Sequence, residues 1–107
     1  MSEELGRMRA ETLATIAELD GQIARVTAAR ANANTDDEHD PEGSTIAFER
    51  SQADALRDAA QHRLAEIDAA EQRIRDGGYG RCEVCGEPIA EARLAARPLA
   101  TRCIRHA

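Results

Sequence analysis

Residues 77–107 read GGYGRCEVCGEPIAEARLAARPLATRCIRHA, and this stretch holds all three cysteines of the 107-residue chain. It contains two short motifs, a CxxC formed by Cys82 and Cys85 and a CxxH formed by Cys103 and His106. A CxxC turn supplies two thiolates from one tight loop, and the CxxH pair can complete the tetrahedral set of a zinc site. We therefore predict one structural zinc ion per chain with these four ligands. Because protein ligands would fill all four positions, none is left for a catalytic water.

Two other interpretations of these residues stay open. The CxxC could be a redox pair, although a thioredoxin-type CxxC needs a strand and a helix around it and no strand pattern precedes Cys82. The three thiols could also hold no metal, and His106 could be an ordinary histidine of the tail. A zinc content well below one ion per chain would exclude the zinc site.

A long helical pattern precedes the cysteine-rich stretch. Residues 2–33 contain no proline, and the last four of their larger apolar residues are spaced by three, four and three, as in the seam of a two-helix coiled coil. This pattern predicts one long helix. Its larger apolar residues are Leu5, Met8, Leu13, Ile16, Leu19, Ile23 and Val26.

A second helix is expected after the polar segment NANTDDEHD at residues 32–40. The sequence Asp40-Pro41-Glu42 favours a helix start, because Asp accepts from free amides, Pro fits the first turn and Glu complements the positive helix end. We expect this helix to run to about Arg75 and to end at Asp76-Gly77-Gly78, where glycine can adopt the left-handed cap. The residues near its apolar face are Ile46, Ala53, Leu56, Ala60, Leu64, Ile67 and Ile74.

These patterns predict an all-α dominated fold with two domains. Residues 1–76 would form a long antiparallel coiled-coil hairpin with an acidic tip at about 34–42, and residues 77–107 would form a small C-terminal zinc-finger module. The composition agrees, since one Phe, one Tyr, no Trp and 22 alanines provide little area for a large core. A metal ion would replace the missing core of the small module.

The charge pattern excludes some classes of function. The formal net charge is −6, and residues 34–49 carry six acidic and no basic side chains, whereas residues 77–107 carry a charge of +2. This balance argues against a protein that coats nucleic acid. No apolar run is long enough for a bilayer and the N-terminal residues are charged, so we expect a cytoplasmic protein without a membrane partner. With no phosphate-binding loop, and no catalytic partner for His39 or His62, we expect no enzyme.

The cysteine-rich stretch closely resembles the zinc module of the DksA/TraR family of bacterial transcription factors. The matching pattern consists of a Tyr-Gly pair shortly before the CxxC-Gly, an Ile four residues beyond the second Cys, Arg-Leu-x-Ala-x-Pro, and a final Cys-x-x-Cys/His. Upstream, DDEHDPEGSTIAFERSQ at residues 36–52 is similar to the family's coiled-coil tip, with Phe48 in register. His106 stands where the family usually has a Cys.

The resemblance implies a regulator that binds RNA polymerase through its secondary channel, with the tip near the active-centre Mg²⁺, and that modulates initiation without sequence-specific DNA binding. The family's tip signature Asp-x-x-Asp-x-Ala matches Asp37 and Asp40, whereas Glu42 stands where the family has Ala. Arg97 matches one basic residue that some members use with the alarmone ppGpp, but Ala107 stands where Lys is expected. We therefore predict polymerase contacts at Asp37, Asp40 and Glu42, whereas the sequence gives no support for dependence on ppGpp.

Two alternative functions stay open. A nucleic-acid-binding zinc finger would need a basic surface with stacking aromatics, and the C-terminal module offers five arginines but no aromatic besides Tyr79. A structural coiled-coil adaptor would dock another protein through its zinc end and make no polymerase contact. Copurification with RNA polymerase and gel shifts distinguish the three hypotheses.

Overall fold

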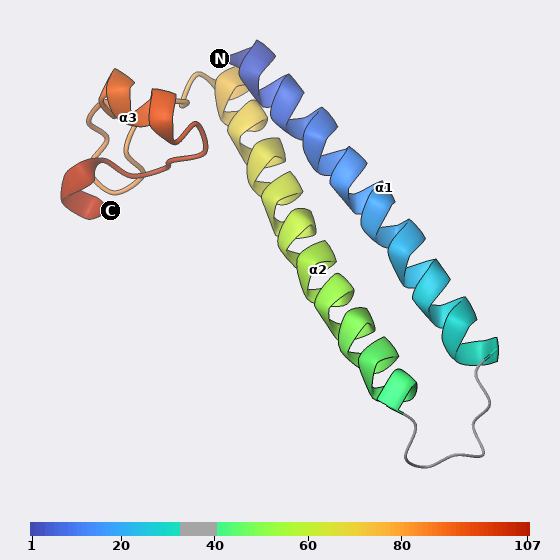
Figure 1. Ribbon diagram of the computed structural model, residues 1–107. Helices are drawn as coiled ribbons and strands as arrows, with labels where there is room; N and C mark the ends of the chain where they lie inside the picture. The colour runs from blue at the N-terminus through green and yellow to red at the C-terminus, as the bar shows by residue number, and fades with distance from the viewer. Residues whose placement is uncertain (33–40) are drawn as a thin grey trace. The chain divides into compact units, whose positions relative to one another are not determined.

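The computed structural model describes residues 1–32 and 41–107 (Figure 1). Two long α-helices dominate it, α1 (Ser2–Asn32) and α2 (Pro41–Asp76), followed by a short helix α3 (Glu91–Ala96) and a 3₁₀ turn η1 (Ile104–His106). The part of the chain described here forms no strand, only an isolated antiparallel bridge between Arg81 and Pro88. The predicted fold class, two long helices and a C-terminal Cys/His module, is confirmed.

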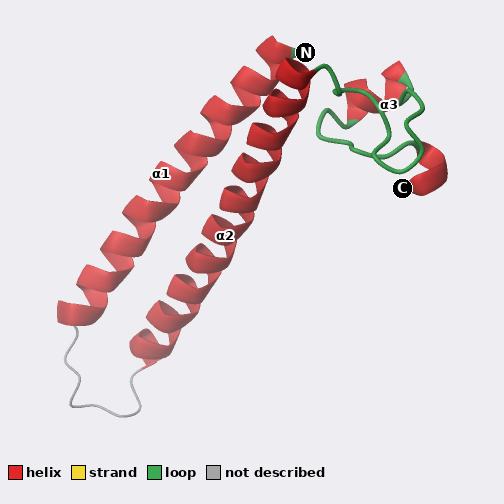
Figure 2. Cartoon of the chain, turned by 180° about the vertical axis from the view of Figure 1, so that it is seen from behind, coloured by secondary structure: helices red, strands yellow, loops and turns green. Residues whose placement is uncertain are grey.

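Both predicted helices have nearly the expected bounds. The acidic tip at about 34–42 lies mostly outside the described residues, and α2 begins at Pro41, the residue that the sequence places in a first turn. Among the described helices, none carries an apolar stretch that could cross a bilayer. Figure 2 shows the same division between helices and the irregular C-terminal segment.

The contacts divide the chain into two compact units, each of which contains parts of α1 and α2 side by side. The first unit consists of Met1–Ala10 and Leu64–Ala107, and the second of Glu11–Arg63. In the first unit, α1 and α2 share a core of Leu5, Met8, Ile67 and Ala70, against which Ile74, Tyr79 and Leu99 pack. The C-terminal segment therefore belongs to the same core as the beginning of α1 and the end of α2.

Ion pairs flank the contact between α1 and α2 in each unit. In the first unit, Arg9 donates to Glu71 at 2.9 Å and also pairs with Asp68. In the second unit, Arg57 pairs with Asp20. All of these groups are partly exposed, so the pairs add little stability but agree with an antiparallel register.

The seam of the hairpin follows a seven-residue repeat, which corrects one of the expected positions, that of Leu56. On α1 the buried repeat is Leu5, Thr12, Leu19 and Val26, and on α2 it is Ile46, Ala53, Ala60, Ile67 and Ile74, of which the first and last are half-buried. Leu56, expected near the apolar face of the second helix, is 52% exposed, and Leu13, a larger apolar residue outside the four with seam spacing, is 48% exposed. Leu13 shares its heptad position with the exposed Asp20, and Leu56 shares its own with the exposed Glu49 and Arg63, although Ala70, one further repeat along, is buried at the end of the helix.

The end of α2 confirms the predicted glycine cap. Gly77 has a φ of 81°, in the left-handed region. Its N–H donates to the Ile74 carbonyl at 3.3 Å, and the Gly78 N–H donates to the Arg73 carbonyl at 2.9 Å. These two bonds form the Schellman motif, which satisfies the last carbonyls of the helix and starts the C-terminal module.

Candidate metal centre

A tight turn positions the first cysteine pair. The Cys82 N–H donates to the Glu87 carbonyl at 2.8 Å, and the Gly86 N–H donates to the Cys82 carbonyl at 2.9 Å. Gly86 has a φ of 74°, so the turn uses the left-handed conformation that glycine adopts without strain. The chain then returns beside itself, with the Ile89 N–H donating to the Gly80 carbonyl at 2.7 Å.

The second pair lies at the start of η1. Cys103 precedes this turn, and the His106 N–H donates to the Cys103 carbonyl at 3.0 Å, so one 3₁₀ turn brings the imidazole back toward the sulfur. The two halves are joined directly, because the Glu83 N–H donates to the Thr101 carbonyl at 2.9 Å. Each half therefore supplies two side chains to a shared centre.

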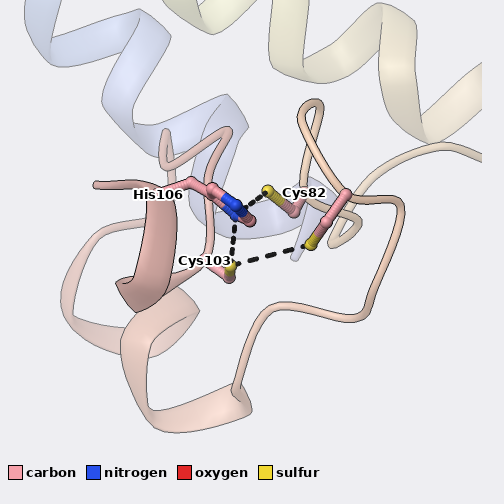
Figure 3. Close-up of side chains that lie close together, drawn as sticks. Cys82, Cys103 and His106 are labelled. Carbon is pink, nitrogen blue, oxygen red and sulfur yellow. Dashed lines mark hydrogen bonds between the residues drawn. The ribbon is translucent and has the colours of Figure 1, made fainter.

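The four predicted ligands converge. Their ligand atoms all lie within 4.8 Å of one another. Figure 3 shows His106 pointing between two sulfurs: its Nδ1 lies 3.2 Å from Cys103 Sγ and 3.6 Å from Cys82 Sγ. The sulfurs of Cys85 and Cys103 are 3.8 Å apart, too far for a disulfide. All three cysteines are free.

These separations fit a tetrahedral zinc shell. Bonds of about 2.3 Å to sulfur and about 2.0 Å to nitrogen give tetrahedron edges of roughly 3.5–3.8 Å. The 3.8 Å sulfur–sulfur and 3.6 Å sulfur–nitrogen distances match such edges, and the 3.2 Å distance is slightly short of one. The cluster is thus a metal-type Cys3His arrangement.

The electrostatics of the cluster favour a bound cation. Burial raises the pKa of the Cys82 thiol, but N–H groups of Cys103, Cys85 and Val84 outweigh it and lower that pKa to about 5. Around Cys85 the Glu87 N–H favours the thiolate, yet burial and the neighbouring sulfurs together raise its pKa. Thiolates this close together repel one another. A divalent cation removes this repulsion, because it stabilises all of the thiolates at once.

A small apolar cluster supports the cysteines. Cys82 and Cys103 are buried together with Ile89 and Leu94, and Tyr79 and Ala100 pack against them. The Tyr79 hydroxyl donates to the Pro98 carbonyl at 2.7 Å. Because Tyr79 packs against this cluster and also against the core of α1 and α2, it links the metal-type centre to the helices within the first unit.

One supporting contact was not predicted from the sequence. Arg102, next to Cys103, donates to Glu83, next to Cys82, at 2.8 Å. This pair lowers the pKa of Glu83, because the hydrogen bond from Arg102 favours the carboxylate. Arg93 Nε donates to the Arg102 carbonyl at 3.0 Å. This bond ties the segment around Arg102 to α3, which carries Arg93. The sequence signal for this contact is that an acidic residue directly follows Cys82 and a basic residue directly precedes Cys103.

The structure does not test the expected tip residues. Asp37 and Asp40 lie outside the described residues, as does His39, and Glu42 lies in α2 without a description of its side chain. His62 is exposed on α2, in line with the expectation that it has no special role. The predicted polymerase contacts at the tip therefore stay predictions.

Comparisons with known proteins concentrate on the C-terminal module. Residues 77–105 match the family model described as the prokaryotic dksA/traR C4-type zinc finger, a match that ends one residue before His106. The RNA polymerase-binding transcription factor DksA of Caulobacter vibrioides is 50% identical over 48 residues, which are 45% of this chain and 34% of that protein. The General stress protein 16O of Bacillus subtilis is 33% identical over 64 residues, which are 60% of this chain and 39% of that protein.

The alignments thus span little more than a third of these curated relatives. The solved structure of transcription factor DksA2 from Pseudomonas aeruginosa is similar over a much larger part, with a TM-score of 0.60 and 27% identity, covering 97% of this chain and 80% of that one. Both DksA proteins are described as transcription factors and not as enzymes, in agreement with the expectation for this chain. The zinc-finger match, the DksA relative and the structural likeness together show that this chain is similar to proteins of the DksA/TraR family, most specifically in residues 77–105.

Proposed function

We propose that this chain is a transcription regulator that binds RNA polymerase directly and works in the cytoplasm, where the polymerase lies. The observation that carries the proposal is the structural likeness to DksA2 over 97% of the chain, combined with the matched zinc-finger segment. The Caulobacter relative is named as RNA polymerase-binding, which supplies the partner. The chain itself has no catalytic role in this proposal.

The proposed cofactor is one structural zinc ion held by Cys82, Cys85, Cys103 and His106. The convergence of these side chains supports it, and so does the fit of their separations to zinc bond lengths. Such an ion stabilises the fold of the small module and leaves no open position for chemistry. Backbone hydrogen bonds of the two turns position the ligands, and the pair Glu83–Arg102 adds a contact between the segments that carry them.

The proposed mode of action places residues 34–49 in the polymerase secondary channel, near the catalytic Mg²⁺. The six acidic side chains of this segment support the idea, because carboxylates bind Mg²⁺ and complement basic channel walls. Asp37 and Asp40 would make the main contacts. Glu42 is larger than the Ala of the family's signature and carries a negative charge, so it would change the contact at that position. No dependence on ppGpp is proposed.

The nucleic-acid hypothesis receives no support from the module. Its single aromatic ring, Tyr79, is half-buried between two apolar clusters, and its hydroxyl is bonded to Pro98. Stacking on bases needs an exposed ring, so Tyr79 cannot serve as a platform. A gel shift at physiological salt should show no specific complex with DNA or RNA.

Copurification and transcription assays test the proposed function. Tagged protein should retain core RNA polymerase from its own organism, and the purified protein should change the initiation rate at promoters sensitive to it. The double variant Asp37→Asn, Asp40→Asn should still bind polymerase but lose most of the effect on initiation. Failure of the wild type to bind would contradict the function, and unchanged activity of the double variant would contradict the tip mechanism alone.

A further inference from the structure

One layer of the seam between α1 and α2 is built from small and polar side chains. Thr12 takes the place in the repeat of α1 between Leu5 and Leu19, and it is 4% exposed. It is the one buried polar residue in the described part of the chain. Ala60 of α2, which is also buried, lines the same cavity as Thr12. A layer of this composition buries less apolar area than a layer with leucine, so it contributes less to the stability of the hairpin.

The cavity beside this layer has a volume of about 150 Å³ and lies within the second unit. Besides Thr12 and Ala60, it is lined by Glu11 and Thr15 of α1 and by Arg63 of α2. A void in a seam loses the contacts that a filled layer would make. This one is polar enough and large enough for water, because a water molecule occupies about 30 Å³ in the liquid.

The layer is weak because of its packing and not because of an unpaired polar group. In residues 1–32 and 41–107, no buried side-chain nitrogen or oxygen atom lacks a hydrogen-bond partner. The closed layer is therefore stable enough to form, but it loses little free energy when water enters beside its polar lining.

The backbone of α1 is weakened at the same place. The Thr15 hydroxyl donates to the Glu11 carbonyl at 3.0 Å. A hydrogen bond from threonine to the carbonyl four residues earlier slightly destabilises a helix and often bends it. Threonine also has a lower helix propensity than alanine or leucine, so Thr12 and Thr15 both reduce the intrinsic stability of this turn.

We propose that the layer of Thr12 and Ala60 is a built-in weak point of the hairpin, where water enters the seam and the two helices separate locally while the layers of Leu19 and Ile67 stay closed. Proteins open locally in this way where a region has few buried apolar contacts. Such a weak point lets the hairpin yield at one layer on contact with a partner. The inference concerns the chain alone, so it does not rest on the proposed function.

Native-state hydrogen exchange tests the weak point. The zinc-loaded full chain is transferred to deuterated buffer, and NMR follows the exchange of each backbone amide. Relative to the intrinsic rates of the sequence, amides within one turn of Thr12 and of Ala60 should exchange at least about tenfold faster than amides around Leu19 and Ile67. Equal rates at all four places would show that the hairpin opens as a whole, and would overturn the inference.

A matched pair of variants tests the cause. Ala60→Val adds two methyl groups to the wall of the cavity and should slow exchange around Thr12 by about fivefold or more. Ala59→Val places the same side chain at the exposed neighbouring position, where it loses the same helix propensity without filling the cavity. It should leave exchange around Thr12 unchanged or slightly faster.

Thr12→Val keeps the test decisive if valine is too large for position 60. It replaces the hydroxyl by a methyl group at nearly constant volume, so it makes the layer apolar without crowding it, and it should also slow local exchange. If neither Thr12→Val nor Ala60→Val slows exchange relative to Ala59→Val, the cavity and the polar layer do not cause local opening, and the inference is wrong. None of these measurements uses polymerase, so their failure would leave the proposed function untouched.

Discussion

At the scale of single residues, His106 is the most informative of the four predicted ligands. Its Nδ1 lies within 3.6 Å of two sulfurs, yet the matched family pattern describes four cysteines and the match ends at residue 105. The turn η1 gives the imidazole this position through the hydrogen bond from its own N–H to the Cys103 carbonyl. Neutral imidazole and thiolate are both good zinc ligands, so the replacement keeps the site.

Substitutions at His106 give a clear prediction. His106→Cys should retain one zinc per chain, whereas His106→Ala should lower the zinc affinity by about 100-fold or more, since four ligands share a binding free energy of roughly 10–16 kcal/mol. Competition with a colorimetric chelator measures both. His62→Ala, at an exposed position on α2, is the control and should leave zinc binding unchanged. Equal zinc affinity of His106→Ala and the wild type would show that His106 is not a ligand.

The metal-type centre was predictable because its ligands come in two local pairs. Spacing within CxxC and CxxH depends only on one turn of chain, which the sequence encodes directly. The bond between Glu83 and Arg102 was not predictable, because it depends on how the segment from Gly86 to Thr101 returns on itself. No local pattern specifies that path.

At the scale of elements, the seven-residue repeat decides which side chains are buried. Leu19 is 7% exposed and belongs to the repeat of α1, whereas Leu13 is 48% exposed although it is the same residue type on the same helix. The sequence predicted both helices and nearly their bounds but placed Leu56 near the apolar face of the second helix and omitted the buried Thr12. Hydrophobicity alone favoured Leu56 over Thr12, but the packing of α1 on α2 buries Thr12 and leaves Leu56 half exposed.

The two leucines form a matched pair for a stability measurement. Leu19→Ala should lower the free energy of unfolding by about 2–4 kcal/mol, because it leaves a cavity in the seam. Leu13→Ala should change it by less than about 0.5 kcal/mol, since the side chain is half in water and Ala has the higher helix propensity. Urea unfolding followed by circular dichroism gives both values. Similar losses for the two variants would contradict the assigned seam.

Two glycines give a second matched pair. Gly77→Ala should destabilise the protein by about 1 kcal/mol, because its φ of 81° is unfavourable for alanine although the space around it is open. Gly6→Ala should instead stabilise it by roughly 0.5–1 kcal/mol, because Gly6 lies inside α1 and an added Cβ meets nothing within 4 Å. Thermal unfolding of both variants checks the opposite signs. Equal shifts in the same direction would contradict the Schellman motif at the end of α2.

At the scale of the whole molecule, the chain separates its tasks by charge. The acidic side chains that account for the net charge of −6 lie at residues 34–49, and the C-terminal module carries a charge of +2. The small core of the first unit joins the helix ends to that module through Tyr79 and Leu99. With few large apolar residues, the module would depend on the proposed zinc ion for its fold, so we expect polymerase binding to require zinc.

Binding of core RNA polymerase to the fluorescently labelled full chain, with and without zinc, tests the central claim most directly. We predict saturable binding with a Kd of about 1 μM or tighter for the zinc-loaded chain, and a loss of at least about tenfold after zinc removal that re-addition of zinc reverses. Cys85→Ser, treated identically, should bind weakly in both conditions. The absence of saturable binding by the zinc-loaded wild type would contradict this claim. So would equal binding before and after zinc removal, once metal analysis has shown that the ion was present and then removed.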